Sequence, residues 1–570
     1  MNDTKRFVIA MALMLGVLVL LQIYSGSQRQ PAQPPDTAGK AGTSDTSPSA
    51  PERATGQASG QAESGTAEQQ TGTVVPAFGI LPAEEGPGRE IVVTAPLYTA
   101  RFSSRGAVLT SFTLTRYPLS KGGPVELVAA GDIRPFGVAL LTKTGDRIDL
   151  AAGAFTVSAE SLAVPAGAET TLAFVLTTAE GLTVTKTCRF RSDTYIIMVD
   201  IEVIGPGSEA VRAVEFGWQS GLQSTELNRN DDLRNFTAIT LTDQGLVKAD
   251  AGKVRKNQQF SVGGVIEWAG LRTKYFWAGF VPTGKTQVIS RSFPGNGESI
   301  GMVVEAERDP VKPLGFMVYV GPLDYQELKA IGHRLEKAVD FGWKWMAPLS
   351  KLIFMFLVAC YKVIPNYGWV IILLSGLTKL LFHPLTQKSM KSMRAMQKLQ
   401  PEMTALREKH KKDPQTLNKA VMELYRKRGV NPMGGCLPLV LQMPVFIALF
   451  NVLSKTIELR QAEFIFWIKD LSAPDVIARL PFSIPFIGSV VSLLPILMGI
   501  AMFVQQKMTT SDPKQAMMTY LLPVVFTFMF FRFPSGLVLY WLVNNILTII
   551  HQYLMNRADR LEQQQVTTGG

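Results

Sequence analysis

The sequence contains little of the two residue types that most often bind metals or carry out catalysis, histidine and cysteine. Only four histidines occur in 570 residues, and none lies between residues 25 and 330. The three cysteines, Cys188, Cys360 and Cys436, are far apart, so the spacing gives neither a disulfide framework nor a zinc site. These absences favour a protein that is not an enzyme and that has no metal or cofactor.

Charged residues are also scarce, and they are unevenly distributed. They make up 18% of the chain, whereas 46% is hydrophobic and is concentrated in blocks. The net charge of +11 would suit a nucleic-acid-binding protein, but residues 388–428 alone hold twelve Lys or Arg against four acidic residues. This distribution predicts a multi-domain membrane protein and gives no reason to expect sequence-specific binding of nucleic acid.

Residues 1–24 have the pattern of a transmembrane anchor, in which Lys5 and Arg6 precede an apolar run that ends at Leu21. A cleaved signal peptide is the alternative, but its apolar core is usually about 7–15 residues long and is followed by a small-x-small site. We favour an uncleaved anchor. Residues 25–75 are rich in Pro, Gly, Ser, Ala, Thr and Gln and predict a disordered linker, because they cannot bury enough apolar surface to fold.

Residues 76–330 alternate between apolar and polar side chains, as half-buried β-strands do. Between Tyr195 and Val203 one face is apolar throughout, while the other becomes acidic. A second segment alternates Leu182, Val184, Cys188 and Phe190 with Thr183, Thr185, Thr187 and Arg189. Many short strands interrupted by Gly and Pro predict a large all-β sandwich that lies outside the membrane.

Five apolar segments in the second half are candidate transmembrane helices: 367–383, 433–454, 484–506, 516–533 and 536–553. The basic segment 388–428 belongs on the cytoplasmic side, as do Lys5 and Arg6, so one crossing separates it from the β domain. We assign that crossing to 367–383. The residues before it, 331–366, are then expected to form an interfacial amphipathic helix, in which Trp and Lys are tolerated.

The resulting topology has six spans, counting the anchor, with the β domain outside the cytoplasm and both termini inside it. Five of the spans form an α-helical transmembrane core over residues 367–556, followed by a cytoplasmic tail, 557–570. This arrangement is an expectation from charge and hydropathy alone.

One motif in the β domain imitates a nucleotide-binding loop. Residues 279–286, GFVPTGKT, fit the phosphate-loop pattern GxxxxGK[ST]. That loop needs a helix after it, whose first backbone amides hold the phosphates. Here the following residues, Gln287 to Ser290, have the pattern of a strand, so we reject the nucleotide-binding interpretation.

The basic segment predicts a cytoplasmic helical hairpin over residues 386–429. Its first arm has an apolar stripe at every third or fourth position, which includes Met390, Met393, Met396 and Met403, with Arg394 beside it. Asp413 and Pro414 are typical of the start of a second helix. The methionines either join the two helices or form an adaptable surface that captures apolar segments of other proteins.

Lys379 lies within a predicted span, where a charge is costly. Ser375, Lys379 and His383 are spaced four residues apart and share one helix face. The lysine is close enough to the cytoplasmic end to extend its amine to the lipid headgroups, which is the structural alternative. Other spans also carry polar residues, namely Gln442 in one and Tyr540, Asn544 and Thr548 on one stripe of another. Together they predict a hydrated, positively charged cavity open to the cytoplasm.

Three stretches resemble the YidC/Oxa/Alb family of bacterial membrane protein insertases: VNPMGGCLPLVLQMPVF, ELRQAEFIFWIKDLS and FRFPSGLVLYWLVNNILTIIHQ. The resemblance is dense over residues 335–556. The anchor, linker and β domain resemble the Gram-negative type, whose periplasmic domain is a β-supersandwich similar to sugar mutarotases. The resemblance implies an inner-membrane location, with a non-enzymatic role as insertase and chaperone.

The resemblance also implies roles for particular residues. Lys379 corresponds to the basic residue of the family's hydrophilic groove, where many relatives have arginine. The other groove positions would be Ser375, Gln442, Tyr540 and Asn544. The basic hairpin would capture nascent membrane proteins. Membrane lipids, the Sec translocon (SecYEG and SecDF) and the ribosome are implied partners, although the tail after Asn556 lacks the long Lys-rich extension of some relatives.

Two other functions are open at this level. A small-solute or anion transporter would use Lys379 to bind its ligand, but it predicts inverted repeats, which the sequence does not show. A membrane-anchored carbohydrate enzyme is a weaker alternative, because the β domain has no histidine and no convincing pair of carboxylates. In an insertase, an entering segment would pass between the apolar outer faces of residues 433–454 and 516–533.

Overall fold

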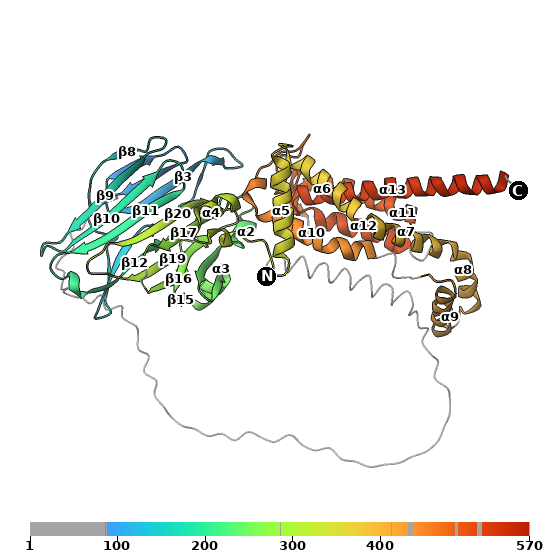
Figure 1. The fold of residues 1–570 in the computed structure, drawn as a ribbon, viewed down its shortest axis with the longest axis horizontal. Helices are drawn as coiled ribbons and strands as arrows, with labels where there is room; N and C mark the ends of the chain where they lie inside the picture. Colours follow the sequence, from blue (N-terminus) through green and yellow to red (C-terminus); the bar gives the residue numbers. More distant parts are fainter. Residues whose placement is uncertain are drawn as a thin grey trace, which may run out of the picture.

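The computed structural model describes residues 86–568, except residues 87, 285–286, 412, 431–436, 485–487 and 510–515. Figure 1 shows a β domain on one side and a helical region on the other, which lie end to end along the longest axis. The predicted anchor 1–24, the linker 25–75 and the first residues of the β domain, 76–85, lie outside the described residues.

The β domain is built from three β-sheets, whose strands are mostly antiparallel. The largest has nine strands in the order β14-β13-β16-β17-β20-β11-β10-β9-β7. Its strands are β14 Gly245–Asp250, β13 Thr237–Thr242, β16 Ile266–Arg272, β17 Phe276–Pro282, β20 Leu314–Pro322, β11 Ile196–Ile204, β10 Thr183–Arg191, β9 Glu169–Thr177 and β7 Thr156–Val157. The apolar side chains of this sheet pack against the two other sheets, as the predicted sandwich requires.

A six-stranded sheet and a five-stranded sheet complete the sandwich. The six strands are β15 Phe260–Gly264, β18 Val288–Pro294, β19 Ile300–Glu307, β12 Val211–Trp218, β5 Val138–Thr142 and β6 Arg147–Asp149. The five are β4 Pro124–Glu126, β3 Val108–Pro118, β2 Tyr98–Ser103, β1 Glu90–Thr94 and β8 Ser161–Ala163. Short helices α2 Arg229–Leu233 and α3 Ala251–Asn257 and a 3₁₀ turn, Ser208–Ala210, lie between strands.

The residues that resemble a phosphate loop begin in one strand and precede a second strand, which belongs to a different sheet. Gly279 to Pro282 belong to β17, and Val288 begins β18. The strand expected after the motif is therefore present, and the arrangement lacks the strand-to-helix turn that phosphate binding needs.

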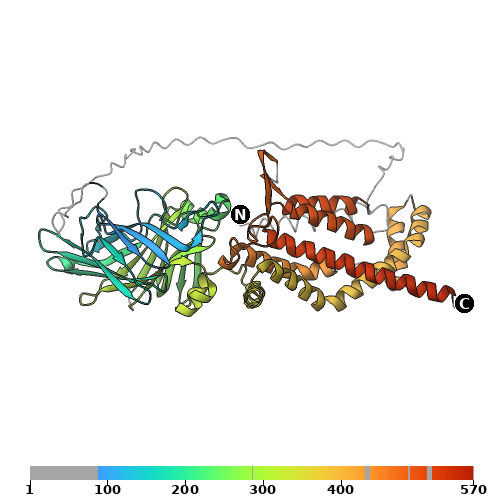
Figure 2. The same ribbon diagram turned by 90° about the horizontal axis from the view of Figure 1, so that it is seen from above.

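A short helical segment connects the β domain to the helical region. It consists of α4 Tyr325–Ile331, a 3₁₀ turn Leu335–Ala338 and α5 Ala347–Tyr361. Figures 1 and 2 together show that α5 runs across the direction of the longer helices beyond it. One side of α5 buries Ile353, Phe354 and Leu357, whereas Leu352 and Met355 are exposed.

The helical region contains eight α-helices among the described residues. They are α6 Tyr367–Leu381, α7 His383–Lys398, α8 Gln400–Lys409, α9 Pro414–Lys427, α10 Leu437–Lys455, α11 Leu494–Thr509, α12 Ala516–Phe530 and α13 Ser535–Thr568. A 3₁₀ turn, Ile457–Leu459, follows α10. Helix α13 packs beside α6 and α11 (Figure 2), and α5 packs against α10.

Three helix boundaries differ from the prediction. The segment 484–506 is not helical throughout, because strands β21 Val476–Ile484 and β22 Gly488–Ser492 form a hairpin before α11 begins at Leu494. The first arm of the basic hairpin is two helices, since α7 ends at Lys398 and α8 starts at Gln400, with Pro401 near its start. The last helix continues through the predicted tail to Thr568.

By length and composition, fewer helices among the described residues qualify as membrane crossings than the six that the sequence predicts for the whole chain. Among the described residues, one helix, Ser535–Ala558, is long and apolar enough to cross a membrane. A second qualifies if α6 and α7 count as one span with a 65° bend. Four further apolar helical stretches are shorter than the 18 residues taken as the minimum for a span: Ala347–Tyr361, Leu441–Lys455, Leu494–Met508 and Tyr520–Phe530.

Candidate functional site

Lys379 is placed by the end of α6 and the bend that follows it. The Asn366 side chain caps the start of α6 by accepting hydrogen bonds from the backbone of Gly368 and Trp369. The helix ends at Leu381, and α7 leaves at 65°, with Pro384 at its second position. Because a proline removes a backbone donor and disfavours helix in the residue before it, the bend follows from the sequence. Lys379 therefore lies in the last turn before the bend.

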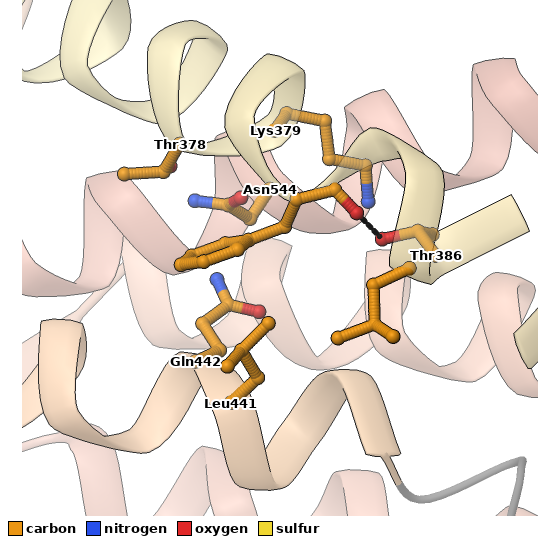
Figure 3. A pocket seen from close by; sticks show the side chains of 8 residues that line it. Thr378, Lys379, Thr386, Leu441, Gln442 and Asn544 are labelled. Atoms are coloured by element: carbon orange, nitrogen blue, oxygen red, sulfur yellow. Dashed lines mark hydrogen bonds between the residues drawn. The ribbon is translucent and has the colours of Figure 1, made fainter.

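A small polar pocket lies beside this turn, between α6, α7, α10 and α13 (Figure 3). The residues that line it are Thr378, Lys379, Phe382, Leu385, Thr386, Leu441, Gln442 and Asn544. Its cavity volume is about 30 Å³, which is room for one or two water molecules and not for a peptide. A polar segment of another protein could enter only if these helices moved apart.

The Lys379 amine takes part in a short chain of hydrogen bonds inside the bundle. Its Nζ donates to Oγ1 of Thr548 on α13 at 2.7 Å, and that hydroxyl donates to the Asn544 carbonyl at 2.6 Å. No ion pair involves Lys379 among the described residues. The positive charge therefore faces neutral acceptors, and a carboxylate that entered the pocket would find an uncompensated partner.

Tyr540 of α13 connects this helix with α10 and α6. Its hydroxyl is buried and lies 3.4 Å from both Gln442 Nε2 and Thr378 Oγ1. The Asn544 side chain donates to the Tyr540 carbonyl of its own helix at 2.8 Å. The predicted residues Lys379, Gln442, Tyr540 and Asn544 thus come together at one place.

Ser375 differs from the other predicted groove residues. It is fully buried, and its hydroxyl donates to the Ile371 carbonyl one turn earlier in α6 at 2.9 Å. It does not line the pocket. Two threonines that the sequence analysis passed over, Thr378 and Thr386, do line it. Thr378 follows Ser375 by three residues on one helix face, which is the signal that could have identified it.

The basic hairpin begins at the same bend. Met403 of α8 is buried and accepts a hydrogen bond from the Tyr425 hydroxyl of α9 at 2.9 Å. Arg394 donates to Asn556 of α13 at 3.0 Å. Met390, Met393 and Met396 are half-buried on α7. Met403 and Arg394 therefore make contacts within the protein, and the most exposed hairpin methionine is Met422 of α9, at 60%.

Of the two helices predicted to present an apolar outer face, α12 carries an exposed apolar stripe. On α12, Leu521, Val524 and Phe528 are 44%, 51% and 47% exposed, respectively, and their spacing places them on one side. Residues 445–453 of α10 are buried instead. The expectation that both helices present an apolar outer face is therefore met by α12 and is wrong for this part of α10, which α5 covers.

The structure defines a class of protein in which a large β domain is joined to an apolar helical region, with a lysine and other polar residues held between the helices. The YidC periplasmic domain family model matches residues 90–356, and the 60Kd inner membrane protein model matches residues 359–563. The chain is 37% identical to the membrane protein insertase YidC of Pelobacter propionicus over 97% of its own length and 99% of the relative's. It is 39% identical to the membrane protein insertase YidC of Geobacter metallireducens over 90% of its own length and 93% of the relative's. The chain belongs to the YidC family of membrane protein insertases.

Solved structures give weaker similarities. A crystal structure of an active YidC insertase is 20% identical, with a TM-score of 0.38, and covers 84% of this chain and 95% of that chain. A galactose mutarotase related enzyme from Lactobacillus acidophilus is 10% identical, with a TM-score of 0.29. The match covers 41% of this chain and 97% of that enzyme's chain.

Proposed function

We propose that this protein inserts hydrophobic segments of newly made proteins into the inner membrane and that the pocket around Lys379 holds their polar flanks during insertion. Membership of the insertase family supports the overall activity. The observation that carries the role of the pocket is the Lys379 amine, which lies inside the bundle against Thr548 and has no acidic partner among the described residues. This contact also argues against an amine that simply extends to the lipid headgroups.

The narrow pocket and the exposed stripe of α12 support a division of labour. The hydrophobic part of a client would lie along Leu521, Val524 and Phe528, in contact with lipid. Its polar flank would enter the pocket after α6 and α13 separate, so that water and the pocket's hydroxyls replace lost hydration. Burial of the client's apolar surface in lipid would then drive its release.

We also propose the six-span topology with both termini in the cytoplasm. Helix α6 has 15 residues, which at 1.5 Å per residue is about 22 Å, less than a hydrocarbon core of about 30 Å. Short spans of this kind are accommodated by local thinning of the bilayer. Thinning beside the pocket would shorten the distance that a polar flank has to cross.

Nascent membrane proteins and lipids are the partners that this function requires. The half-buried methionines Met390, Met393 and Met396, with Met422 on the second arm, would form the capture surface of the hairpin. Contacts with the Sec translocon and the ribosome are expectations from the family resemblance alone. The anion-transporter alternative has no support among the relatives.

The test replaces Lys379 with alanine and, separately, with arginine. The client is a small membrane protein with an acidic translocated tail, and its insertion is measured in vesicles that carry equal amounts of purified full-length protein. Alanine should reduce insertion at least tenfold, the equivalent of about 1.4 kcal/mol in the barrier, because the carboxylates lose their only cationic partner in the pocket. Arginine should restore most of it.

The control is Lys362→Ala, which removes one exposed lysine at the end of α5 and leaves the pocket unchanged. It should insert the client at the normal rate. Normal insertion by Lys379→Ala would contradict the role of the charge, and equal loss in both lysine variants would point to net charge instead of the pocket.

A further inference from the structure

The β21–β22 hairpin presents an apolar surface that nothing else in the described structure covers. Val476, Ile477 and Phe482 are 37%, 46% and 60% exposed. Arg479 is the single charged residue between Val476 and Ser492. A soluble strand would place polar residues on one of its faces, whereas here both faces of the first strand are largely apolar.

The hairpin is held firmly at its base, although no third strand among the described residues pairs with it. The Asp475 carboxylate accepts hydrogen bonds from the backbone of Leu493 and Leu494 at 2.9 and 2.7 Å, and from Trp467 Nε1 at 3.0 Å. It therefore joins the two ends of the hairpin and caps α11. An isolated two-stranded hairpin is marginally stable in water, so a surface that receives its apolar side chains would stabilise it.

The direction of the hairpin indicates what that surface is. Figure 2 shows it, in orange-red, projecting sideways from the bundle, across the direction of α11, α12 and α13. It leaves the helical region at the end nearest the β domain, the same end at which α5 runs across the bundle (Figures 1 and 2). If the bundle spans the membrane, the hairpin lies along the membrane surface on the periplasmic side.

An exposed apolar stripe on α11 follows shortly after the hairpin in the sequence. Ile496, Ile500 and Val504 are spaced four residues apart and are 36%, 56% and 40% exposed. This stripe begins four residues after the hairpin ends at Ser492. Phe466 is 79% exposed and stacks on Trp467, the tryptophan that donates a hydrogen bond to Asp475. Aromatic side chains of this kind are typical of a membrane interface.

We propose that the β21–β22 hairpin inserts its apolar side chains into the outer leaflet, at the boundary between headgroups and acyl chains, and so anchors the periplasmic end of α11. Arg479 would face the lipid phosphates. Such interfacial elements bury apolar side chains to about 5–10 Å in this region. The proposal rests on the span arrangement proposed above, and the experiment separates the two.

The experiment places an environment-sensitive nitrobenzoxadiazole probe on single cysteines of the full-length protein in vesicles. The background is Cys188→Ala, Cys360→Ala and Cys436→Ala, and the test sites are Phe482→Cys and Ile477→Cys. Quenching is measured with lipids that carry a nitroxide near the headgroup. Ile500→Cys reports whether α11 lies in lipid, and Val311→Cys, 86% exposed before the start of β20, reports the aqueous baseline.

Quenching several-fold above the Val311 baseline at both hairpin sites is the expected result. Quenching at Ile500 with none at the hairpin overturns the anchor and leaves the span arrangement intact. Blue-shifted emission at the hairpin without quenching also overturns it and points to a protein partner. Absence of quenching at Ile500 and at both hairpin sites overturns the anchor together with the span arrangement.

Discussion

At the scale of single residues, the clearest departure from the sequence pattern is a buried lysine in the β domain. Lys186 lies on the inward face of β10, between Val184 and Cys188, and is fully buried. Its Nζ donates to the carbonyls of Ala107 and Phe136 at 2.6 and 2.7 Å. Three phenylalanine rings lie within 5.7 Å of it. Strict alternation predicts the inward position, but no pattern predicts that two backbone carbonyls compensate the charge.

Lys186 should make the stability of the β domain depend on pH in the alkaline range. Burial lowers the pKa of Lys186 to about 8, whereas an unfolded lysine titrates near 10.4. The unfolded state therefore binds more protons between these values, and stability rises with pH across this window. Across the whole window, the free energy of unfolding should rise by about 3 kcal/mol.

The variant Lys186→Met should be at least as stable as the parent at pH 7 and should lose this rise between pH 8 and 10. Thermal unfolding of the full-length protein in detergent, followed by near-ultraviolet circular dichroism, measures both. The exposed Lys143→Met is the control and should keep the parent's pH dependence. If the stability of Lys186→Met still rises with pH as it does in the parent, the rise comes from other titrating groups.

At the scale of elements, periodicity identified the kinds of structure better than their limits. The alternation around β10 and β11 predicted paired strands, and they pair antiparallel. The apolar run at 484–506 predicts one helix, and the structure corrects this for its first part, because a short apolar run fits a strand and a buried helix equally well. The signals for a hairpin in the sequence are two prolines and a glycine: Pro481, Pro485 and Gly488. In the candidate site, the stripe spacing predicts that Lys379 and Asn544 face one cavity. The complete burial of Ser375 depends on how the helices pack and cannot be read from that spacing, although its hydrogen bond to the Ile371 carbonyl is local to α6.

Asp475 should determine both the start of α11 and the position of the β21–β22 hairpin. Asp475→Ala removes an acceptor for two backbone amides and for Trp467, so we expect a loss of about 1–2 kcal/mol in local stability. Hydrogen exchange of the full-length protein should speed up at Leu493, Leu494 and the strands before them. Asp413→Ala removes the equivalent cap of α9 and should affect α9 alone. Unchanged exchange in Asp475→Ala would show that helix packing alone fixes the hairpin.

At the scale of the whole molecule, two groups of charges join the β domain to the helical region. Asp340 lies 3.0 Å from Lys455 at the end of α10, 3.5 Å from Lys248 and 3.7 Å from Arg272 of the β domain. Arg460, beyond α10, pairs with Glu226 at 2.8 Å and is buried. Because α10 also carries Gln442 of the pocket, these contacts fix the pocket relative to the β domain.

The Asp340 carboxylate should stabilise this junction at neutral pH and lose that effect in acid. Burial raises the pKa of Asp340, but Lys455, Arg272 and Lys248 outweigh it and hold the pKa well below its usual range. A carboxyl group with a lowered pKa stabilises the folded state above its unfolded pKa of about 3.9, and the effect fades as the pH falls towards the folded value. Asp340→Asn should therefore cost about 2 kcal/mol at pH 7, less than the 3–5 kcal/mol of a fully buried pair, since the carboxylate is partly exposed.

Thermal unfolding in detergent at pH 7 and at pH 3.5 tests this for the parent, Asp340→Asn and the exposed control Asp132→Asn. The difference in stability between the parent and Asp340→Asn should shrink at the lower pH. There the unfolded parent binds a proton at Asp340, so keeping this carboxylate charged in the folded state stabilises the parent less. The control should match the parent at both values. A difference of equal size at both pH values would mean that Asp340 acts through the shape and hydrogen bonds of the junction. The three cations would then be held by the fold, and the charge of Asp340 would not be what docks the β domain onto α10.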